Sequence, residues 1–268
     1  MKLPMFSHSR WTDHAMCPLM YKLKSIDYAC GLCKKGPIPK DSTVCPFCKT
    51  VLVRSEALEK GIKFSVEIEK YLLGGDNEVW VREYIKNDKA FIAAKSLRNA
   101  RVLNPATIQV EVAKFYHPSD RFYAIMGKMD IVTLDPSECT AQVIDWKTGS
   151  VGKRKGLKAG ASGKYDTQLE LYALLTMMNH LWVTEVSTHL YFVDAIDVGR
   201  IDRETYTRSQ IPRMVQTWLE RADKWGMEKD FSATPGYWCN WCSFTYEKGG
   251  PCTVKTKKEE VIYGEVKG

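Results

Sequence analysis

Two aspartates and one lysine stand in adjacent segments whose other residues have the pattern of buried strands. Asp130 lies in "GKMDIVTL", and Asp145 and Lys147 lie in "AQVIDWKT", with the turn "DPSECT" between the two segments. If Leu134 pairs with Ala141 across this turn, the antiparallel register places Asp130 opposite Asp145, with β-carbons about 5 Å apart on one face. Lys147 follows Asp145 by two residues and is therefore expected on the same face.

This arrangement predicts a particular chemistry. Two carboxylates so close together repel each other, and burying them without a partner is costly. A divalent cation between Asp130 and Asp145 removes that cost, and Mg²⁺ or Mn²⁺ fits best because hard cations take carboxylate oxygens and retain waters. Lys147 beside the ion can position or deprotonate the attacking water and stabilise charge on a phosphate, which predicts hydrolysis. The alternative is a salt bridge from Lys147 to one of the aspartates.

The surrounding sequence predicts the elements that hold these residues. A helix is expected over 55–73, with one face formed by positions at steps of four and three: Leu58, Ile62, Ser65, Glu69 and Leu72. Glu69 is therefore expected to point inward. Further helices are expected at about 87–102, 166–182 and 211–225, and further strands at 107–116 and 186–194. Helices and strands mix along the whole chain, which predicts an α/β (α+β) fold.

Three motifs in this order resemble the signature of a known family. "GKMDIV", "VIDWKTG" and "QLELY" are similar to the G-x-x-D, D-x-K and Q-x-x-x-Y motifs of the PD-(D/E)XK nuclease superfamily, specifically its RecB-type exonuclease branch. The resemblance implies a restriction-endonuclease-like mixed central sheet flanked by helices. It also implies Asp130, Asp145 and the main-chain carbonyl of Trp146 as ligands of Mg²⁺ or Mn²⁺, and Lys147 as the catalytic lysine.

The same resemblance assigns the helix that follows these strands. Gln168 and Tyr172 lie one helical turn apart, and the family pattern implies that both line the cleft near the substrate backbone. Without the resemblance, the pair would be interpreted as ordinary residues of a helix surface.

One position departs from the family pattern. The first motif of this branch usually carries a histidine on a helix, four residues before a glutamate, whereas "GIKFSVEIE" offers Ser65 and Glu69. Activity is still expected through carboxylate ligands, with either one or two bound ions. Glu69 is predicted to assist through water, and the alternative is a paired helix carboxylate. Glu111, on the strand before Asp130, is a weaker candidate for the cleft, and its alternative is a position facing solvent.

The nine cysteines separate into two candidate metal sites. The chain contains no apolar run of the roughly 20 residues that a membrane helix needs and no apolar signal segment, so we expect it inside the cell, where thiols stay reduced. Cysteines at such spacings then indicate metal binding. The first site has the pattern C-x₂-C, eleven residues, C-x₂-C, which predicts a structural zinc ribbon, with rubredoxin-like iron as the alternative: Cys30, Cys33, Cys45 and Cys48.

The second site joins the two ends of the chain. Cys239, Cys242 and Cys252 supply three ligands, and a tetrahedral site or a cluster needs a fourth. The resemblance to the RecB-type branch implies that Cys17, in "MCPLMYKL", completes a 4Fe-4S cluster that ties the N- and C-terminal segments together. Zinc at this site is the alternative. Cys139, in the turn between two strands, is expected to be incidental.

Charge adds a candidate surface for nucleic acid. The formal net charge of +7 falls to roughly +3 if both cysteine sites bind metal as four thiolates, so local clustering is the better guide. Five basic residues and no acid lie between 148 and 164: Lys153, Arg154, Lys155, Lys158 and Lys164. We expect this segment to bind nucleic acid, and a solvated linker is the alternative.

These observations together predict a function and a domain organisation. We expect a metal-dependent deoxyribonuclease, an exonuclease acting on single-stranded or frayed DNA ends in recombination, repair or replication, in a prokaryotic or viral setting and without a membrane partner. The sequence has no GxxxxGK[ST] loop, so a helicase or recombination protein is the expected partner. The alternative is a catalytically silent nucleic-acid-binding or assembly protein with the same fold. The expected parts are 1–28, a ribbon at 29–54, a nuclease core at 55–230, and a C-terminal cysteine segment at 231–268.

Overall fold

The chain divides into two compact units, which are described separately. The computed structural model describes residues 5–39, 42, 44–50, 56–75, 78–86, 88–103, 107–148, 163–193, 202–240 and 242–254. The sheet unit comprises Met1–His8 and Arg54–Asp223, and the cysteine unit comprises Ser9–Val53 and Lys224–Gly268. Within the described part of the chain, no helix combines the length and the apolar composition needed to cross a membrane.

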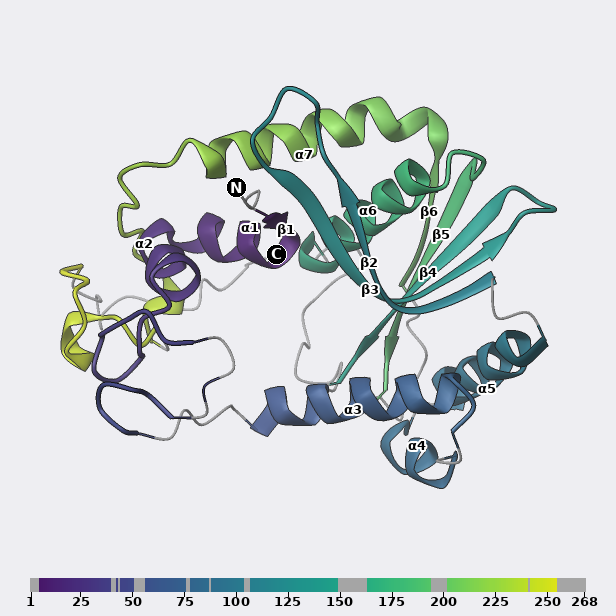
Figure 1. The fold of residues 1–268 in the computed structure, drawn as a ribbon, viewed down its shortest axis with the longest axis horizontal. Coiled ribbons are helices and arrows are strands. Elements are labelled where there is room, and N and C mark those ends of the chain that lie inside the picture. The colour runs from purple at the N-terminus through teal and green to yellow at the C-terminus, as the bar shows by residue number, and fades with distance from the viewer. Residues whose placement is uncertain are drawn as a thin grey trace, which may run out of the picture. The chain divides into compact units, whose positions relative to one another are not determined.

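A six-stranded mixed sheet with helices around it forms the sheet unit (Figure 1). The strands are β1 (Met5–Ser7), β2 (Ile108–Tyr116), β3 (Ala124–Asp135), β4 (Thr140–Lys147), β5 (Glu185–Phe192) and β6 (Asp202–Thr207). The helices are α3 (Glu56–Leu72), α4 (Glu78–Tyr84), α5 (Asp88–Leu103), α6 (Gly163–Asn179) and most of α7 (Ile211–Gly226). This architecture confirms the predicted α/β fold class with a mixed sheet flanked by helices.

The register of the central hairpin agrees with the sequence. β3 and β4 pair antiparallel, Leu134 lies opposite Ala141, and the ladder runs up to the pair of Ile131 with Ile144. β4 then continues the sheet by pairing parallel with β5, which pairs antiparallel with β6. If the β3–β4 ladder is extended by one residue pair, Asp130 lies opposite Asp145, which is the predicted register.

The two edges of β3 are occupied differently. Along one edge, β2 pairs antiparallel with residues 125–133. Along the other edge, β1 pairs parallel with residues 124–126 and β4 pairs with residues 131–135. No strand among the described residues pairs with residues 127–130 of β3 on that second edge. Asp130 therefore lies where β4 leaves β3.

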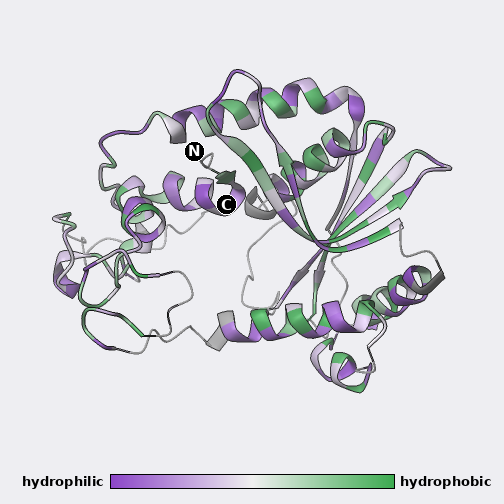
Figure 2. Ribbon diagram, viewed as in Figure 1, coloured by the Kyte–Doolittle hydropathy of each residue, from purple (hydrophilic) through white to green (hydrophobic). Residues whose placement is uncertain are grey.

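One hydrophobic core of this unit lies under α3, α4 and α5. Ile131, Ile144 and Trp146 pack there against a set of buried helix residues that includes Phe64, Ile68, Tyr71 and Leu72 of α3. The expected alternation in β4 is therefore present, with Ile144 and Trp146 in this core. Figure 2 shows hydrophobic and hydrophilic residues alternating along α3 and α7, as expected for helices with one buried side.

Two details of the helix predictions were wrong. The buried stripe of α3 runs through Phe64, Ile68 and Tyr71, whereas Ile62 of the predicted stripe is 40% exposed. Packing against the sheet decides which side of the helix is buried, and the apolar residues of α3 allow either choice. α6 ends at Asn179, so Trp182 lies beyond the helix.

The cysteine unit consists of short elements and loops. It contains most of α1 (His8–Met16), α2 (Pro18–Tyr21), a π-helical turn (Lys22–Ile26), and the 3₁₀ turns Tyr237–Asn240 and Tyr246–Lys248. Its core includes Cys17, Met20, Cys242 and Phe244. Lys34 joins the loops by donating hydrogen bonds to the carbonyls of Gly31 and Ser243.

Candidate active site and metal centres

The two predicted metal-binding aspartates occupy the point where β3 and β4 part. Asp130 Oδ2 accepts a hydrogen bond of 2.7 Å from the backbone N–H of Trp146. Asp145 is 3% exposed, and its Oδ2 forms an ion pair with the Nζ of Lys147. The salt bridge considered as an alternative is therefore present in the structure, between Lys147 and Asp145.

Burial raises the pKa of both carboxyl groups. Burial and the charge of Asp145 raise the pKa of Asp130 to about 7, although the Trp146 N–H and the Lys147 ammonium act in the opposite direction. Burial also raises the pKa of Asp145, and Lys147 opposes this effect. A divalent cation would favour the ionised form of both groups.

α6 supplies the polar pair predicted from the third motif. Gln168 donates from Nε2 to Asp145 Oδ1 at 3.3 Å and to the hydroxyl of Tyr172 at 2.7 Å. Its Oε1 accepts a hydrogen bond of 3.4 Å from Lys147 Nζ. Burial, followed by the charge of Asp145, raises the pKa of Tyr172. Gln168 thus links the two charged residues of β4 to the hydroxyl of Tyr172.

A glycine allows α6 to approach the sheet this closely. A β-carbon at Gly127 would lie 2.9 Å from side-chain carbons of both Tyr172 and Leu175. Contacts this short are not tolerated in a packed interior. The glycine of the G-x-x-D motif is thus explained by the space that Tyr172 and Leu175 need.

α3 contributes Ser65, the residue that the sequence resemblance aligned with a histidine. The Ser65 hydroxyl donates a hydrogen bond of 2.7 Å to Glu111 Oε1, and Lys128 forms an ion pair with Glu111 Oε2. Glu69 is half-buried one turn further along α3. The carboxylate of Glu69 lies close enough to Lys128 to help raise the pKa of that lysine, for which the hydrogen bond to Glu111 is the main cause.

Glu111, which the sequence made only a weaker candidate for the cleft, belongs to this group of residues in the structure. The ladder pairs Val110 with Ile131 and Val112 with Met129, so Glu111 lies across from Asp130. Its side chain is 13% exposed, and its charge acts on both Asp130 and Asp145. The position facing solvent, considered from the sequence, is therefore wrong. The alternation along β2 was a usable signal, because it puts Glu111 on the side opposite Val110.

The set of donors suits a hard divalent cation. Carboxylate oxygens are the ligands that Mg²⁺ and Mn²⁺ prefer, and Asp130, Asp145 and Glu111 supply them from three adjacent strands. In the structure these carboxylates are paired with N–H groups instead: Trp146 with Asp130, Lys147 with Asp145 and Lys128 with Glu111. A bound ion could take over these pairings.

Comparison with known proteins identifies the family. A family model described as the PD-(D/E)XK nuclease superfamily matches residues 56–246, which include every residue of the site just described. The chain belongs to the PD-(D/E)XK nuclease superfamily. PD-(D/E)XK nucleases use divalent metals, and the superfamily implies a nucleic acid substrate, so nuclease activity in general follows from the match.

Other comparisons are more distant. The crystal structure of SSO0001 is 16% identical, with a TM-score of 0.32, and the match covers 74% of this chain and 83% of that chain. A protein from Eubacterium rectale described as "Putative exonuclease" is 13% identical, with a TM-score of 0.42, and the match covers 85% of this chain and 83% of that chain. No curated protein sequence matches the chain.

The predicted nucleic-acid-binding residues of this PD-(D/E)XK chain are not part of the described site. Lys153, Arg154, Lys155 and Lys158 lie outside the described residues. Lys164 belongs to α6, but its side chain also lies outside the described part. Their role in binding stays a prediction.

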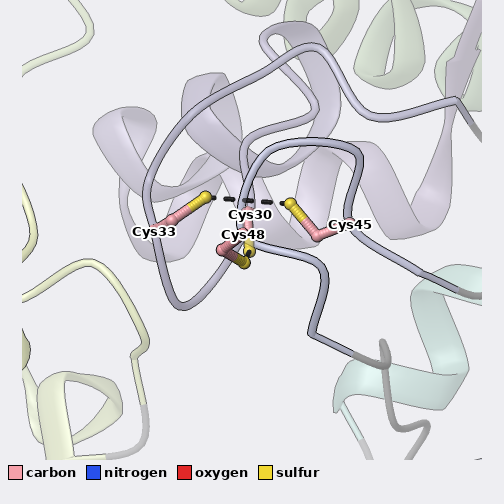
Figure 3. A group of neighbouring side chains, drawn as sticks. All are labelled: Cys30, Cys33, Cys45 and Cys48. Atoms are coloured by element: carbon pink, nitrogen blue, oxygen red, sulfur yellow. Dashed lines mark hydrogen bonds between the residues drawn. The ribbon is translucent and has the colours of Figure 1, made fainter.

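The four ribbon cysteines converge on a common centre (Figure 3). Among the described residues, they form the one group of three or more His, Cys, Asp or Glu whose ligand atoms all lie within 4.8 Å of one another. The Sγ atoms of Cys30 and Cys48 are 3.9 Å apart, and those of Cys33 and Cys45 are 3.7 Å apart. A tetrahedral metal with four thiolate ligands has sulfur–sulfur edges of about 3.8 Å, so the quartet has the dimensions of a metal site.

The two halves of the ribbon repeat one local geometry. Each C-x₂-C turn is followed by a lysine with positive φ, 61° at Lys34 and 59° at Lys49. The N–H of each lysine bonds to the carbonyl of the first cysteine of its turn, at 3.0 Å in both cases. Hydrogen bonds from Thr50 lower the pKa of Cys48, which favours the thiolate that binds metal, whereas hydrogen bonds with the other three cysteines raise the pKa of Cys33.

The other predicted cysteine set is looser. Cys17 and Cys242 are buried in one small cluster with Met20 and Phe244. Burial raises the pKa of Cys252, and the charges of the other three cysteines of the set also raise it: Cys17, Cys239 and Cys242. The four thiols thus lie near enough to interact, although they do not converge as closely as the ribbon cysteines. Cys139 belongs to the sheet unit, in the turn between β3 and β4.

Proposed function

We propose that this PD-(D/E)XK chain is a metal-dependent exonuclease that hydrolyses phosphodiester bonds at single-stranded or frayed DNA ends. The observation that supports it most is the meeting of Asp130, Asp145 and Lys147 where β4 leaves β3. All three lie inside the segment that matches the nuclease family. Recombination, repair or replication would provide such ends.

Each side chain of the site has a role in this proposal. Asp130, Asp145 and the Trp146 carbonyl hold Mg²⁺ or Mn²⁺, which polarises the phosphate and activates water when bound. Lys147 turns its ammonium from Asp145 toward the phosphate and stabilises the charge that develops there. Gln168 orients Asp145 and, with Tyr172, lines the path of the DNA backbone. Glu69 acts at longer range, through Lys128 or through water.

We also propose a resident metal for each cysteine set. Zinc in the ribbon is supported by four Sγ atoms within 4.8 Å of one another. A 4Fe-4S cluster held by Cys17, Cys239, Cys242 and Cys252 is supported by the electrostatic coupling of these thiols and by the resemblance to the RecB-type branch. Both groups are structural in this proposal, because a closed four-thiolate site has no open position for chemistry.

Two features of the sequence support the proposed substrate, a cluster of basic residues and the lack of a phosphate-binding loop. A positively charged segment including Lys153, Arg154, Lys155, Lys158 and Lys164 is proposed to follow the phosphates of single-stranded DNA. The sequence has no phosphate-binding loop for ATP hydrolysis. We therefore propose that a helicase or recombination protein supplies the opened ends.

A comparison of linear with circular DNA tests this function. Full-length protein, purified without oxygen, is incubated with Mg²⁺ or Mn²⁺ and with linear or circular single-stranded DNA of the same sequence. An exonuclease degrades the linear DNA and leaves the circle intact. Cleavage of the circle would show an endonuclease. Binding of both DNAs without cleavage under either metal would support the catalytically silent protein, which the serine at the place of the histidine favours.

A further inference from the structure

Ser65 and Glu111 together take the place of the histidine that is missing from α3. We infer that Glu111 is a third carboxylate ligand of the catalytic metal, that Ser65 positions it, and that Lys128 neutralises it until the metal binds. This inference rests on the proposed nuclease function and extends it to three residues that the motifs do not assign.

The position of Glu111 in the sheet is the first argument. Glu111 on β2 lies across from Asp130 on β3, and Asp130 meets Asp145 of β4 where the ladder ends. Three neighbouring strands thus present one carboxylate each along a single line. The Glu111 side chain is 13% exposed, so it faces the interior of the site rather than bulk water.

The second argument is that Glu111 is held by contacts from two other elements. Ser65 of α3 donates to one carboxylate oxygen at 2.7 Å, and Lys128 of β3 pairs with the other oxygen. Glu111 also has a φ of 51°, a left-handed conformation that is strained for a residue with a β-carbon. A side chain that only faced solvent would need neither the contacts nor the strained backbone.

The balance of charge is the third argument. Three carboxylates meet here, those of Glu111, Asp130 and Asp145, and two lysines pair with them among the described residues, Lys128 with Glu111 and Lys147 with Asp145. An excess of buried negative charge is costly unless a cation offsets it. Lys128 now occupies the oxygen of Glu111 that a metal would need. Binding of the metal then requires Lys128 to leave, and Ser65 keeps Glu111 in place when it does.

The affinity for Mn²⁺, measured without DNA by electron paramagnetic resonance, tests this inference. Zinc-loaded full-length protein is compared with Glu111→Gln, Ser65→Ala, Ser65→Thr and Lys128→Met. We expect Glu111→Gln to weaken Mn²⁺ binding by about 10- to 100-fold. Ser65→Ala should weaken it several-fold, Ser65→Thr should restore it, and Lys128→Met should strengthen it by removing a competing cation. Glu67→Gln is the matched control, since Glu67 lies on the same helix and pairs with Lys70 instead.

One further variant, Asp145→Asn, separates this inference from the proposed function. Asp145→Asn should lose both Mn²⁺ binding and cleavage if the proposed function holds. Unchanged Mn²⁺ affinity in Glu111→Gln, alongside the loss in Asp145→Asn, would overturn the inference and leave the function standing. If the wild-type protein neither binds Mn²⁺ nor cleaves DNA, both the inference and the proposed function are overturned. If Glu111→Gln does not fold, as judged by thermal unfolding, the opposite shifts expected for Ser65→Ala and Lys128→Met decide the matter.

Discussion

Asp130 is a residue whose protonation the metal should change. Without metal, its pKa of about 7 lies far above the ordinary value of 3.8, mainly because the group is buried. Between these two values the folded protein keeps the proton that the unfolded chain has lost, so a rise in pH through this window favours unfolding. Ionised Asp130 therefore lowers the stability of the metal-free protein fully above about pH 7 and has no such effect below about pH 4.

Replacement of Asp130 by asparagine should remove this penalty. At about pH 8 in metal-free buffer, Asp130→Asn should be more stable than wild type by on the order of 2 kcal/mol, and the difference should shrink toward pH 5. Urea unfolding of both proteins at several pH values measures this difference in the free energy of unfolding. Glu138→Gln, in the exposed turn after β3, serves as the control. A stability difference that does not vary with pH would show that burial of Asp130 carries no such cost.

The residues of this site differ in how far the sequence could reveal them. Asp130, Asp145 and Lys147 are predictable, because strand alternation and one hairpin register place them together. Gln168 and Tyr172 were assigned through the resemblance to the family, since helical spacing shows only that they lie one turn apart. Glu111 was only a weaker candidate, because alternation along β2 indicates its side of the sheet but neither its hydrogen bond to Ser65, 46 residues away, nor its positive φ.

Among the elements, β3 and α6 are in unusually close contact at Gly127. The sequence predicted both elements, but only the structure gives their separation, since no local pattern encodes the distance between a helix and a strand. The same limit explains why Ile62 was wrongly predicted to be buried on α3, whereas Leu72 of the predicted face is buried. The amphipathic pattern of α3 leaves Ile62 or Phe64 as the buried position, and packing against Trp146 and Ile144 selects Phe64.

Gly127→Ala should push α6 away from the sheet. The added carbon would lie 2.9 Å from Tyr172 and Leu175, and such overpacking costs about 1–3 kcal/mol. Denaturant unfolding should show this loss of stability. DNA cleavage should fall as well, because Gln168 is part of α6 and would move with it. Gly61→Ala is a useful control within α3, where alanine favours the helix by up to about 1 kcal/mol. Equal stability of Gly127→Ala and wild type would contradict the close contact.

At the scale of the whole molecule, the two cysteine sets belong to the same compact unit. In the sequence, spacing indicated the ribbon quartet, whereas the resemblance to the RecB-type branch supplied Cys17 for the second set. The sequence could not show that the ribbon and the C-terminal segment pack together. This packing involves the Lys34 ammonium, which donates a hydrogen bond to the carbonyl of Ser243 and lies 5.7 Å from the centroid of the Phe244 ring.

The two proposed metals should respond separately to cysteine substitutions. Cys45→Ala should lose zinc and keep iron, because Cys45 belongs to the ribbon quartet. Cys252→Ala should lose iron, with its broad visible absorbance, and keep zinc. Metal analysis of protein purified without oxygen measures both, with Cys139→Ser as a control that keeps both metals. Zinc in place of iron at the second set, with no visible absorbance in wild type, would refute the cluster.

The central claim is that Asp130, Asp145 and Lys147 form a metal-dependent site that cuts phosphodiesters. Its most direct measurement is the cleavage of end-labelled single-stranded DNA in Mg²⁺ or Mn²⁺ by wild type and by Lys147→Ala, with DNA binding and Mn²⁺ affinity recorded for both. The wild type should degrade the DNA, and Lys147→Ala should bind DNA and Mn²⁺ yet cleave at least about 100-fold more slowly. Equal cleavage by the two proteins would contradict the account.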